Sequence, residues 1–389
     1  MHILVINSGS SSIKFAVYEL DSFILQIEGF VECIGFDTSA IIWKKSGSRF
    51  EKTLKVNNHE DGLSSIIDLL KECDLAYNIK GIGHRVVHGG KFFSESTVVD
   101  ERVIKLIEAC IPLAPLHNPH NIAGILACQK IFVGIPNVVV FDTAFASTMP
   151  IEAKNYAIPR KIRDEYAIQR YGFHGTSHRY VSTEARRILS ESGRKNGRLI
   201  TLHLGNGCSA SAILDGKCVD TTMGFTPLEG LMMGTRSGDI DPSIFSYLNE
   251  QHDMSVQDVY EMLNKDCGLL GVSGKSSDMR QLKSLAADGH VDSAIAIDMF
   301  VYRLCQKIAA LTVALGGLDA LVFTGGIGEN DTDLRRKTIA KLPFLDVDID
   351  SARNQAQQIF LSSEDKETAV MIVPTNEEKA IALETSEKI

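Results

Sequence analysis

The sequence predicts an α/β protein built from two similar modules, and three observations lead to that class. Short apolar runs rich in Val and Ile, typical of buried strands, alternate with segments of helical periodicity. The first twenty residues, MHILVINSGSSSIKFAVYEL, and residues 199–213, LITLHLGNGCSASAI, share a strand, a turn rich in Gly, Asn and Ser, and a returning strand. The length of 389 residues suits two or three domains of the usual ~100–200 residues. We therefore expect a duplicated module with a ligand cleft between its copies.

The opening stretch predicts two strands joined by a turn that can bind an anion. Residues 3–6 are apolar, residues 7–12 are polar, and Ile13, Phe15 and Val17 alternate with smaller or polar residues. Such a turn offers backbone N–H groups and hydroxyls to an anion, and Lys14 adds positive charge. Asn7, expected just past the strand end, is placed to bind a metal directly or through water. Taken alone, the stretch fits an ordinary N-terminal hairpin equally well.

Strands and helices then alternate up to a connector that breaks both periodicities. The expected elements are short strands over 20–55, a helix over 62–73, a strand over 79–90, a helix over 101–110, a loop over 113–121, a helix ending at 131, and a buried strand over 136–144 that ends at Asp142. We place a domain boundary in the connector, residues 145–156. The predicted domains are 1–146, completed by a C-terminal helix over 376–389, and 147–375.

The second half repeats the alternation. Its expected elements are a Gly-rich loop over 170–181 that leads into a helix ending near 190, strands over 198–204 and 209–214, a helix starting with a capping box at Ser255 and Asp258, a helix over 291–315, a strand over 320–323, a Gly-rich loop over 324–330, and a strand over 369–374. Thr375, with Glu378 three residues later, predicts a second capping box at the start of the last helix.

Composition excludes several classes of protein. The 40 Lys and Arg against 49 Asp and Glu give a net charge of −9, which argues against binding nucleic acid. No apolar run approaches the ~18 residues of a membrane span, and no secretory leader is recognised. The eight cysteines include no CxxC pair, so neither a disulfide framework nor a zinc site is indicated. We expect a cytoplasmic protein without membrane contact.

Three Gly-rich or Ser-rich turns, each directly after a strand, indicate a nucleoside triphosphate as ligand. They are residues 7–12, 205–209 and 324–330. Two familiar phosphate motifs are absent. From Gly268 to the Gly274-Lys275-Ser276 sequence there are five intervening residues, where a P-loop has four, and no GxGxxG follows the first strand.

Five stretches together resemble the acetate kinase (acetokinase) family: NSGSSSIKF from Asn7, GHRVVHGG from Gly83, YGFHGTSHRY from Tyr171, HLGNGCSA from His203 and TGGIGEN from Thr324. MGTRSGDIDP (233–242) and PTNEEKAIA (374–382) extend the resemblance across nearly the whole chain. It implies the ribonuclease H-like fold of actin, hexokinase and the Hsp70 chaperones, duplicated around a nucleotide cleft. It also implies reversible transfer of a phosphoryl group from ATP to acetate, giving ADP and acetyl phosphate. The metal would be Mg²⁺, with Mn²⁺ as an alternative, and the assembly a homodimer.

The chemistry of that reaction explains the candidate catalytic residues. A carboxylate acceptor with a pKa of about 4 is already ionised at neutral pH, so no general base is needed. The barrier is repulsion between two anions, which positive charge on the transferring group lowers. Arg85 and Arg236 suit this need, although each alone also fits a structural ion pair. By resemblance, Arg85 binds acetate, Arg236 stabilises the transition state, and His174 donates to the phosphoryl oxygens.

Asp142, at the end of a buried strand, could orient an arginine or a metal-bound water, and the resemblance makes it an active-site residue. Covalent phosphorylation of Asp142 is a less favoured alternative. The resemblance makes Asn7 and Glu377 the metal ligands, although Glu378 lies beside Glu377. Mg²⁺ usually takes few carboxylates together with phosphate and water.

The remaining candidates are implied by the resemblance, and for Lys14 and the turns at 205–209 and 324–330 it agrees with the anion-binding pattern described above. Those for an apolar acceptor pocket are Val87, Leu116, Phe173 and Pro227. Those for the nucleotide are Lys14, His203, Leu204, Gly205, Asn206, Gly207, Asp278, Met279, Arg280, Gly326, Ile327, Gly328, Glu329 and Asn330. An apolar pocket discriminates one methylene by only ~1–3 kcal/mol, so propionate and butyrate remain alternative acceptors.

Other functions remain open on the same residues. A conformational ATPase of the actin or chaperone type would use the phosphate turns but not the two arginines and His174. A sugar kinase would need a general base, and Asp142 could serve. The pairs His84/His88 and His174/His178 have i, i+4 spacing, but the first lies on an expected strand and the second spans a loop, which disfavours zinc.

Overall fold

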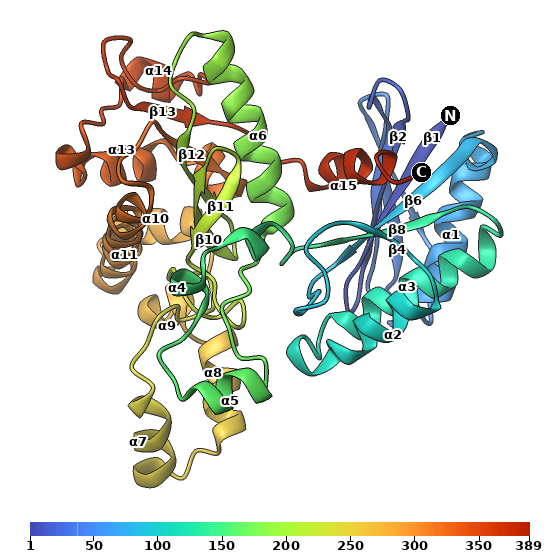
Figure 1. The fold of residues 1–389 in the computed structure, drawn as a ribbon, viewed down its shortest axis with the longest axis horizontal. Coiled ribbons are helices and arrows are strands. Elements are labelled where there is room, and N and C mark those ends of the chain that lie inside the picture. Colours follow the sequence, from blue (N-terminus) through green and yellow to red (C-terminus); the bar gives the residue numbers. More distant parts are fainter. Residues whose placement is uncertain (37) are drawn as a thin grey trace. The chain divides into compact units, whose positions relative to one another are not determined.

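The computed structural model describes residues 1–36 and 38–389. The chain separates into two compact units (Figure 1). The first unit contains residues 1–145 and 376–389, and the second contains residues 146–375. The chain thus enters the second unit after Phe145 and returns to the first at Asn376, which places the last helix in the unit where the chain began.

The described residues of the first unit form an eight-stranded sheet with strand order β5-β4-β3-β2-β1-β6-β8-β7. Its strands are β1 (His2–Ser8), β2 (Ile13–Glu19), β3 (Leu25–Glu32), β4 (Ala40–Lys45), β5 (Ser48–Thr53), β6 (Ile79–Val86), β7 (Thr97–Val98) and β8 (Asn137–Phe141). Its helices are α1 (His59–Glu72), η1 (Ala76–Asn78), α2 (Glu101–Ala109), η2 (Ile111–Leu113), α3 (Asn118–Ile131) and α15 (Glu377–Ser386).

Strand β1 lies at the centre of this sheet and is buried on both faces. Leu4 and Ile6 join a core with side chains of α1 and α3, whereas Ile3 and Val5 pack with Ile381 of α15. Burial on both faces explains why β1 is continuously apolar rather than alternating. The returning strand β2 places Asn7 opposite Lys14 in an antiparallel pair.

The described residues of the second unit form a five-stranded sheet with strand order β11-β10-β9-β12-β13. Its strands are β9 (Arg198–Leu204), β10 (Cys208–Leu214), β11 (Lys217–Thr221), β12 (Ala320–Thr324) and β13 (Ala369–Ile372). Its helices are α4 (Ile151–Lys154), α5 (Arg160–Glu165), α6 (Gly175–Glu191), α7 (Ser243–His252), α8 (Val256–Lys265), α9 (Gly268–Ser273), α10 (Met279–Ala287), α11 (Val291–Leu315), α12 (Gly325–Asn330), α13 (Thr332–Ala340), η4 (Pro343–Leu345) and α14 (Ser351–Gln355), and η3 (Phe145–Thr148) lies at its start.

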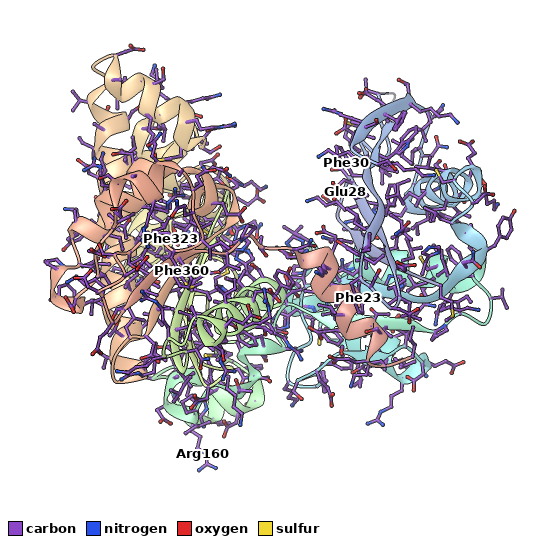
Figure 2. The ribbon with its side chains drawn as sticks, turned by 90° about the horizontal axis from the view of Figure 1, so that it is seen from above. Phe23, Glu28, Phe30, Arg160, Phe323 and Phe360 are labelled. Carbon is purple, nitrogen blue, oxygen red and sulfur yellow. The ribbon has the colours of Figure 1, made fainter. Side chains whose placement is uncertain are left out.

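Helices α6 and α11 both pack on this second sheet (Figure 1). Helix α11 is buried along one stripe at steps of four and three, formed by Ile297, Val301, Leu304, Ile308 and Leu311. Every residue of β12 is buried, and Figure 2 shows its Phe323 among the side chains of the second unit.

The two sheets share one topology, which confirms the predicted duplicated α/β class. In the first unit, β3, β2 and β1 are antiparallel neighbours, and β6 and β8 continue in parallel. In the second, β11, β10 and β9 are antiparallel, and β12 and β13 continue in parallel. Strands β1 and β9 also have the same pattern of buried and half-buried residues. The strand–turn–strand repeat seen in the sequence therefore forms the centre of each sheet.

Several predicted boundaries are confirmed and three are corrected. Strand β9, helix α11 and the capping box of Ser255 and Asp258 occur as expected. Asn7 lies within β1 rather than past its end. The expected Gly-rich loop over 324–330 is mostly helix α12, since Gly325 adopts φ 77° and turns the chain from strand into helix.

The last helix is capped by Asn376, not by Thr375. The Asn376 side chain accepts a hydrogen bond from the backbone N–H of Lys379 at 2.8 Å. Thr375 instead shares a 2.8 Å hydrogen bond with the Ser177 hydroxyl. The predicted Thr375/Glu378 capping box is therefore wrong by one residue. Asn is at least as good an N-cap as Thr, and here Asn376 takes that position while the Thr375 hydroxyl bonds to Ser177.

In the part of the chain that the structure describes, no helix is long and apolar enough to cross a membrane. All eight cysteines are free thiols.

Candidate active site

In the first unit, the ends of the parallel strands bring four polar side chains together. Asn7 comes from β1, Arg85 from β6, Asp142 directly follows β8, and Glu377 opens α15. Neighbouring parallel strands end at the same edge of a sheet, which is where α/β proteins bind ligands. The sequence candidates for metal and acceptor thus share one edge.

Arg85 is the centre of this group. Its Nη2 and Nε atoms donate to the two oxygens of the buried Asp142 carboxylate, with a Nε–Oδ1 distance of 3.2 Å. Its Nη1 atom lies 3.5 Å from Asn7 Oδ1, and Glu377 Oε2 lies 4.0 Å from Nε. Desolvation alone would lower the pKa of Arg85, but the carboxylates of Asp142 and Glu377 raise it above its ordinary value. Of the roles left open for Asp142, this pair of hydrogen bonds fits the orientation of an arginine.

Glu377 is a quarter exposed and has a displaced pKa. Desolvation raises the pKa of this carboxyl from 4.5 to about 7, since the repulsion from Asp142 and Glu378 adds to desolvation while Arg85 and Lys14 only partly offset it. The nearby Glu378 lines a different surface depression with Lys14. A carboxylate and an amide oxygen are ligands of the type that Mg²⁺ prefers, so Glu377 and Asn7 fit this metal.

In the second unit, the turn between β9 and β10 presents a glycine to two proposed catalytic groups. A β-carbon built on Gly207 would lie 3.3 Å from Arg236 Nη2 and 3.4 Å from His174 Nε2. A side chain at Gly207 would thus fill the space in which these groups converge. The turn is closed by a 3.0 Å hydrogen bond from the Gly205 N–H to the Gly207 carbonyl.

His174 is held from three directions. It is the N-cap of α6 and adopts φ 55°, a left-handed conformation that is uncommon for a non-glycine residue. Its Nδ1 atom lies 2.9 Å from Ser209 Oγ, and its ring packs on that of His203 with centroids 4.4 Å apart. This packing fixes which way the ring edge faces.

Arg236 differs from Arg85 in its hydrogen-bond partner, which is a backbone carbonyl. Its Nη1 atom donates to the Pro227 carbonyl at 2.9 Å, and no acidic side chain of the described residues forms an ion pair with it. Burial accordingly lowers its pKa. A half-buried guanidinium is chemically suited to binding a carboxylate or phosphate group.

A cavity of about 790 Å³ opens next to the same turn, within the second unit. It contains eight of the residues predicted for the nucleotide: Gly205, Asn206, Asp278, Met279, Arg280, Gly326, Ile327 and Asn330. This volume lies within the usual range for cofactor pockets. Asp278 caps α10 and pairs with Arg280, whose hydrogen bonds lower the pKa of the Asp278 carboxyl to about 2.

The other predicted nucleotide residues do not line this cavity. Lys14 belongs to the first unit, Leu204 and Gly328 are buried, and His203 and Gly207 lie beside His174. Glu329 turns inward, where its Oε1 atom accepts from the N–H groups of Gly325 at 2.8 Å and Thr375 at 3.2 Å.

The four predicted acceptor-pocket residues are divided between the units. Val87 is buried and Leu116 is 63% exposed in the first unit, whereas buried Phe173 and half-buried Pro227 belong to the second.

The histidine pairs have partners of their own. His84 Nε2 lies 2.7 Å from Asn137 Oδ1, and His88 Nδ1 accepts from the Gly90 N–H at 2.9 Å. His178 contacts Thr201 and Ser209, each at 2.7 Å.

Sequence reasoning did not single out Ser209, Thr201 or Arg335. The HxxxH pattern at the start of α6 was the available signal for the first two, since an i, i+4 pair on a helix faces one neighbour. No sequence signal marked Arg335, whose fully buried guanidinium donates to the Gly328 and Glu329 carbonyls at 2.8 Å.

The chain is similar to known proteins over nearly its whole length. The model of the Acetokinase family matches residues 2–383. Acetate kinase 2 of Neisseria meningitidis serogroup B is 48% identical, and the alignment covers 99% of this chain and 98% of the relative.

Two solved structures have nearly the same fold. A propionate kinase from Francisella tularensis subsp. tularensis superposes with a TM-score of 0.95 at 44% identity, covering all of both chains. Acetate kinase of Porphyromonas gingivalis gives a TM-score of 0.93 at 40% identity, covering 99% of this chain and 98% of its own. The family model and these relatives, which match over nearly the full length, show that this chain belongs to the acetokinase family.

Proposed function

We propose that this protein is an acetate kinase, which transfers the γ-phosphoryl group of ATP to acetate and, in reverse, from acetyl phosphate to ADP. The observation that carries the proposal is the convergence of Arg236 and His174 on Gly207, beside the cavity of the phosphate turn. These groups supply positive charge and a hydrogen-bond donor, which phosphoryl transfer needs.

The proposed division of labour follows the chemistry of each group. Arg85, oriented by Asp142, binds the acetate carboxylate with its guanidinium. Acetate attacks in line as an ionised nucleophile, so no side chain removes a proton. Arg236 and His174 stabilise the charge that spreads over the equatorial phosphoryl oxygens.

Asn7 and Glu377 are the proposed ligands of Mg²⁺, with Mn²⁺ as an alternative. When bound, the metal ion neutralises charge on the nucleotide phosphates and aligns them. Lys14, Gly205, Asn206 and Gly207 are proposed to contact the phosphates. Asp278, Met279, Arg280, Gly326, Ile327 and Asn330 line the cavity proposed for the adenosine.

Acceptor, location and assembly are part of the same proposal. Val87, Leu116, Phe173 and Pro227 are proposed to surround the methyl group of acetate. We further propose that the enzyme acts in the cytoplasm as a homodimer, without nucleic-acid or membrane partners.

Propionate is the second candidate acceptor, because the Francisella protein with TM-score 0.95 is named a propionate kinase. Initial rates with Mg-ATP and acetate, propionate or butyrate, read as hydroxamate after hydroxylamine trapping, separate the candidates. We expect the highest kcat/KM for acetate, with propionate lower by about 10- to 200-fold at most. A higher value for propionate would reassign the acceptor, and ATP hydrolysis that needs no carboxylate would exclude the kinase.

A further inference from the structure

One hydrogen-bonded chain of four side chains ends at His174. Ser209 Oγ lies 2.9 Å from His174 Nδ1 and 2.7 Å from His178 Nε2. On the other side of its ring, His178 Nδ1 lies 2.7 Å from Thr201 Oγ1. The order is therefore Thr201, His178, Ser209, His174, all within the second unit.

The first three members are completely buried. Thr201, His178 and Ser209 each have 0% of their surface exposed, so no bulk water reaches their polar atoms. Desolvation, with a smaller contribution from His203, lowers the pKa of His178 to about 3. His178 is thus neutral at physiological pH, with one ring nitrogen donating and the other accepting.

The burial of Thr201 determines which atom donates and which accepts in each of these hydrogen bonds. Within the described part of the protein, His178 Nδ1 is the hydrogen-bond partner of the Thr201 hydroxyl. Donation to Nδ1 satisfies that hydroxyl, whereas the reverse direction leaves a buried O–H without an acceptor, at a cost of about 1–3 kcal/mol.

The positions of the protons on His178, Ser209 and His174 follow from the donation by Thr201. His178 accepts at Nδ1 and therefore carries its proton on Nε2, which donates to Ser209 Oγ. Ser209 then donates its own proton to His174 Nδ1. The proton of a neutral His174 consequently lies on Nε2, the nitrogen beside Gly207 and Arg236.

We propose that Thr201, His178 and Ser209 are positioning residues that keep the His174 proton on Nε2. Protonation of His174 at Nδ1 would either reverse all three hydrogen bonds or leave the buried Ser209 O–H without a histidine acceptor, so these hydrogen bonds also favour the neutral imidazole. In the reaction, which rests on the proposed function, Nε2–H is then the donor to a phosphoryl oxygen. A fixed tautomer matters because a histidine in the wrong one cannot donate at that atom.

The ring nitrogens of His174 can be observed directly. We would label histidines with ¹⁵N, assign His174 by comparison with His174→Gln, and record two-bond ¹H–¹⁵N spectra at neutral pH. We expect a ¹⁵N chemical shift of the pyridine type at Nδ1 and of the pyrrole type at Nε2. The opposite pattern in the wild-type protein would overturn the proposal, whatever the variants do.

Thr201→Val removes the hydroxyl donor with little change of shape. We expect mixed tautomers at His174 and a loss in kcat of about 10- to 100-fold, with KM for ATP and the carboxylate nearly unchanged. Thr201→Ser should restore both the single tautomer and kcat.

Thr338→Val is the matched control, since Thr338 is also fully buried in the second unit but donates to the Leu334 carbonyl at 2.8 Å. It should lose stability without changing the His174 signals or kcat. Wild-type kcat and a single Nε2–H tautomer in Thr201→Val would overturn the proposal. If the wild type phosphorylates no carboxylate while its proton lies on Nε2, the proposed function fails and the proton assignment stands.

Discussion

Arg85 and Arg236 have the same side chain in opposite electrostatic surroundings. Arg85 is bound by Asp142 on two nitrogens and has Glu377 within 4.0 Å, so its charge is compensated and its guanidinium plane is fixed. Arg236 contacts the Pro227 carbonyl and is partly desolvated, which lowers its pKa. The first arrangement suits recognition of a carboxylate of fixed geometry, and the second suits charge that develops during the reaction.

Replacing each arginine should therefore affect different kinetic constants. Arg85→Ala should raise KM for acetate about tenfold or more, because it removes a bidentate ligand of the acceptor. Arg236→Ala should lower kcat about 10²- to 10³-fold, because its charge acts mainly in the transition state. Initial rates over acetate and ATP concentrations check both. Arg187→Ala, which breaks only exposed ion pairs with Glu184 and Glu191, is the control, and near-wild-type kinetics for both test variants would remove the proposed roles.

The raised pKa of Glu377 predicts how stability depends on pH. The carboxyl titrates at about 7 when folded and near 4.5 when unfolded, so the folded chain binds the proton more tightly. This contribution to stability is complete below pH 4.5 and is lost as pH rises to about 7.

Glu377→Gln removes the ionisable group, so the variant should not lose this stability as pH rises. Without metal at pH 8, the variant should unfold at a higher temperature than the wild type, and each ~1 kcal/mol corresponds to roughly 2–4 °C. Added Mg²⁺ should stabilise the wild type more than the variant. Thermal unfolding between pH 5 and 8 measures both effects, and a wild-type advantage at pH 8 without metal would contradict the prediction.

At the scale of elements, α12 is a short helix held at both ends by hydrogen bonds from side chains, one of them fully buried. At its start, Glu329 accepts from the Gly325 N–H. At its end, Arg335 donates to the Gly328 and Glu329 carbonyls, which a helix terminus leaves unpaired, and to Asn354 Oδ1 at 2.8 Å. Since Gly326, Ile327 and Asn330 line the cavity beside the turn between β9 and β10, these caps also position that wall of the cavity.

Arg335→Met tests this support. It leaves several buried acceptors without a donor, so we expect a loss of about 3 kcal/mol or more in the free energy of unfolding. KM for ATP should rise as α12 loosens. Arg336→Met is the matched control, since its neighbouring guanidinium is 56% exposed and pairs with Asp333, and it should stay within about 0.5 kcal/mol. Urea unfolding gives both values, and equal losses in the two variants would contradict the capping role.

The helices and strands show what periodicity can and cannot predict. Strand β9 and helix α11 were predicted residue by residue, because burial on one face or both leaves a repeating apolar signal. Helix α12 was predicted as a loop, because a Gly-rich helix of six residues has no such repeat and depends on Glu329 and Arg335. The cap of α15 was misplaced by one residue, since Thr375 and Asn376 both cap well and the Ser177 contact decides between them.

At the scale of the whole molecule, a repeated topology gives each unit a turn at the same place, and the two turns have diverged. Asn7 faces Lys14 across the first turn, whereas His203 faces Ser209 across the second. The first unit contains Arg85, proposed to bind the acceptor, and the two proposed metal ligands. The second contains His174, Arg236 and the cavity proposed for the nucleotide.

Most proposed site residues could be identified from sequence because they lie in contiguous motifs at strand ends. The hydrogen-bonded chain from Thr201 to His174 could not be identified in this way. Its members come from β9, α6 and β10 and come together only when the protein folds. The same applies to Arg335, whose partner Asn354 is 19 residues away. Long-range hydrogen bonds leave no local periodicity to read.

We propose that groups from both units act on one phosphoryl group during its transfer to a carboxylate. The most direct measurement is a crystal structure with Mg-ADP, acetate and aluminium fluoride as a mimic of the transferring group. We predict that Arg85, His174 and Arg236 all contact acetate or the mimic, and that Asn7 and Glu377 contact the metal or its waters. A mimic bound without contact to Arg85, or without contact to His174 and Arg236, would show that the two units do not act together.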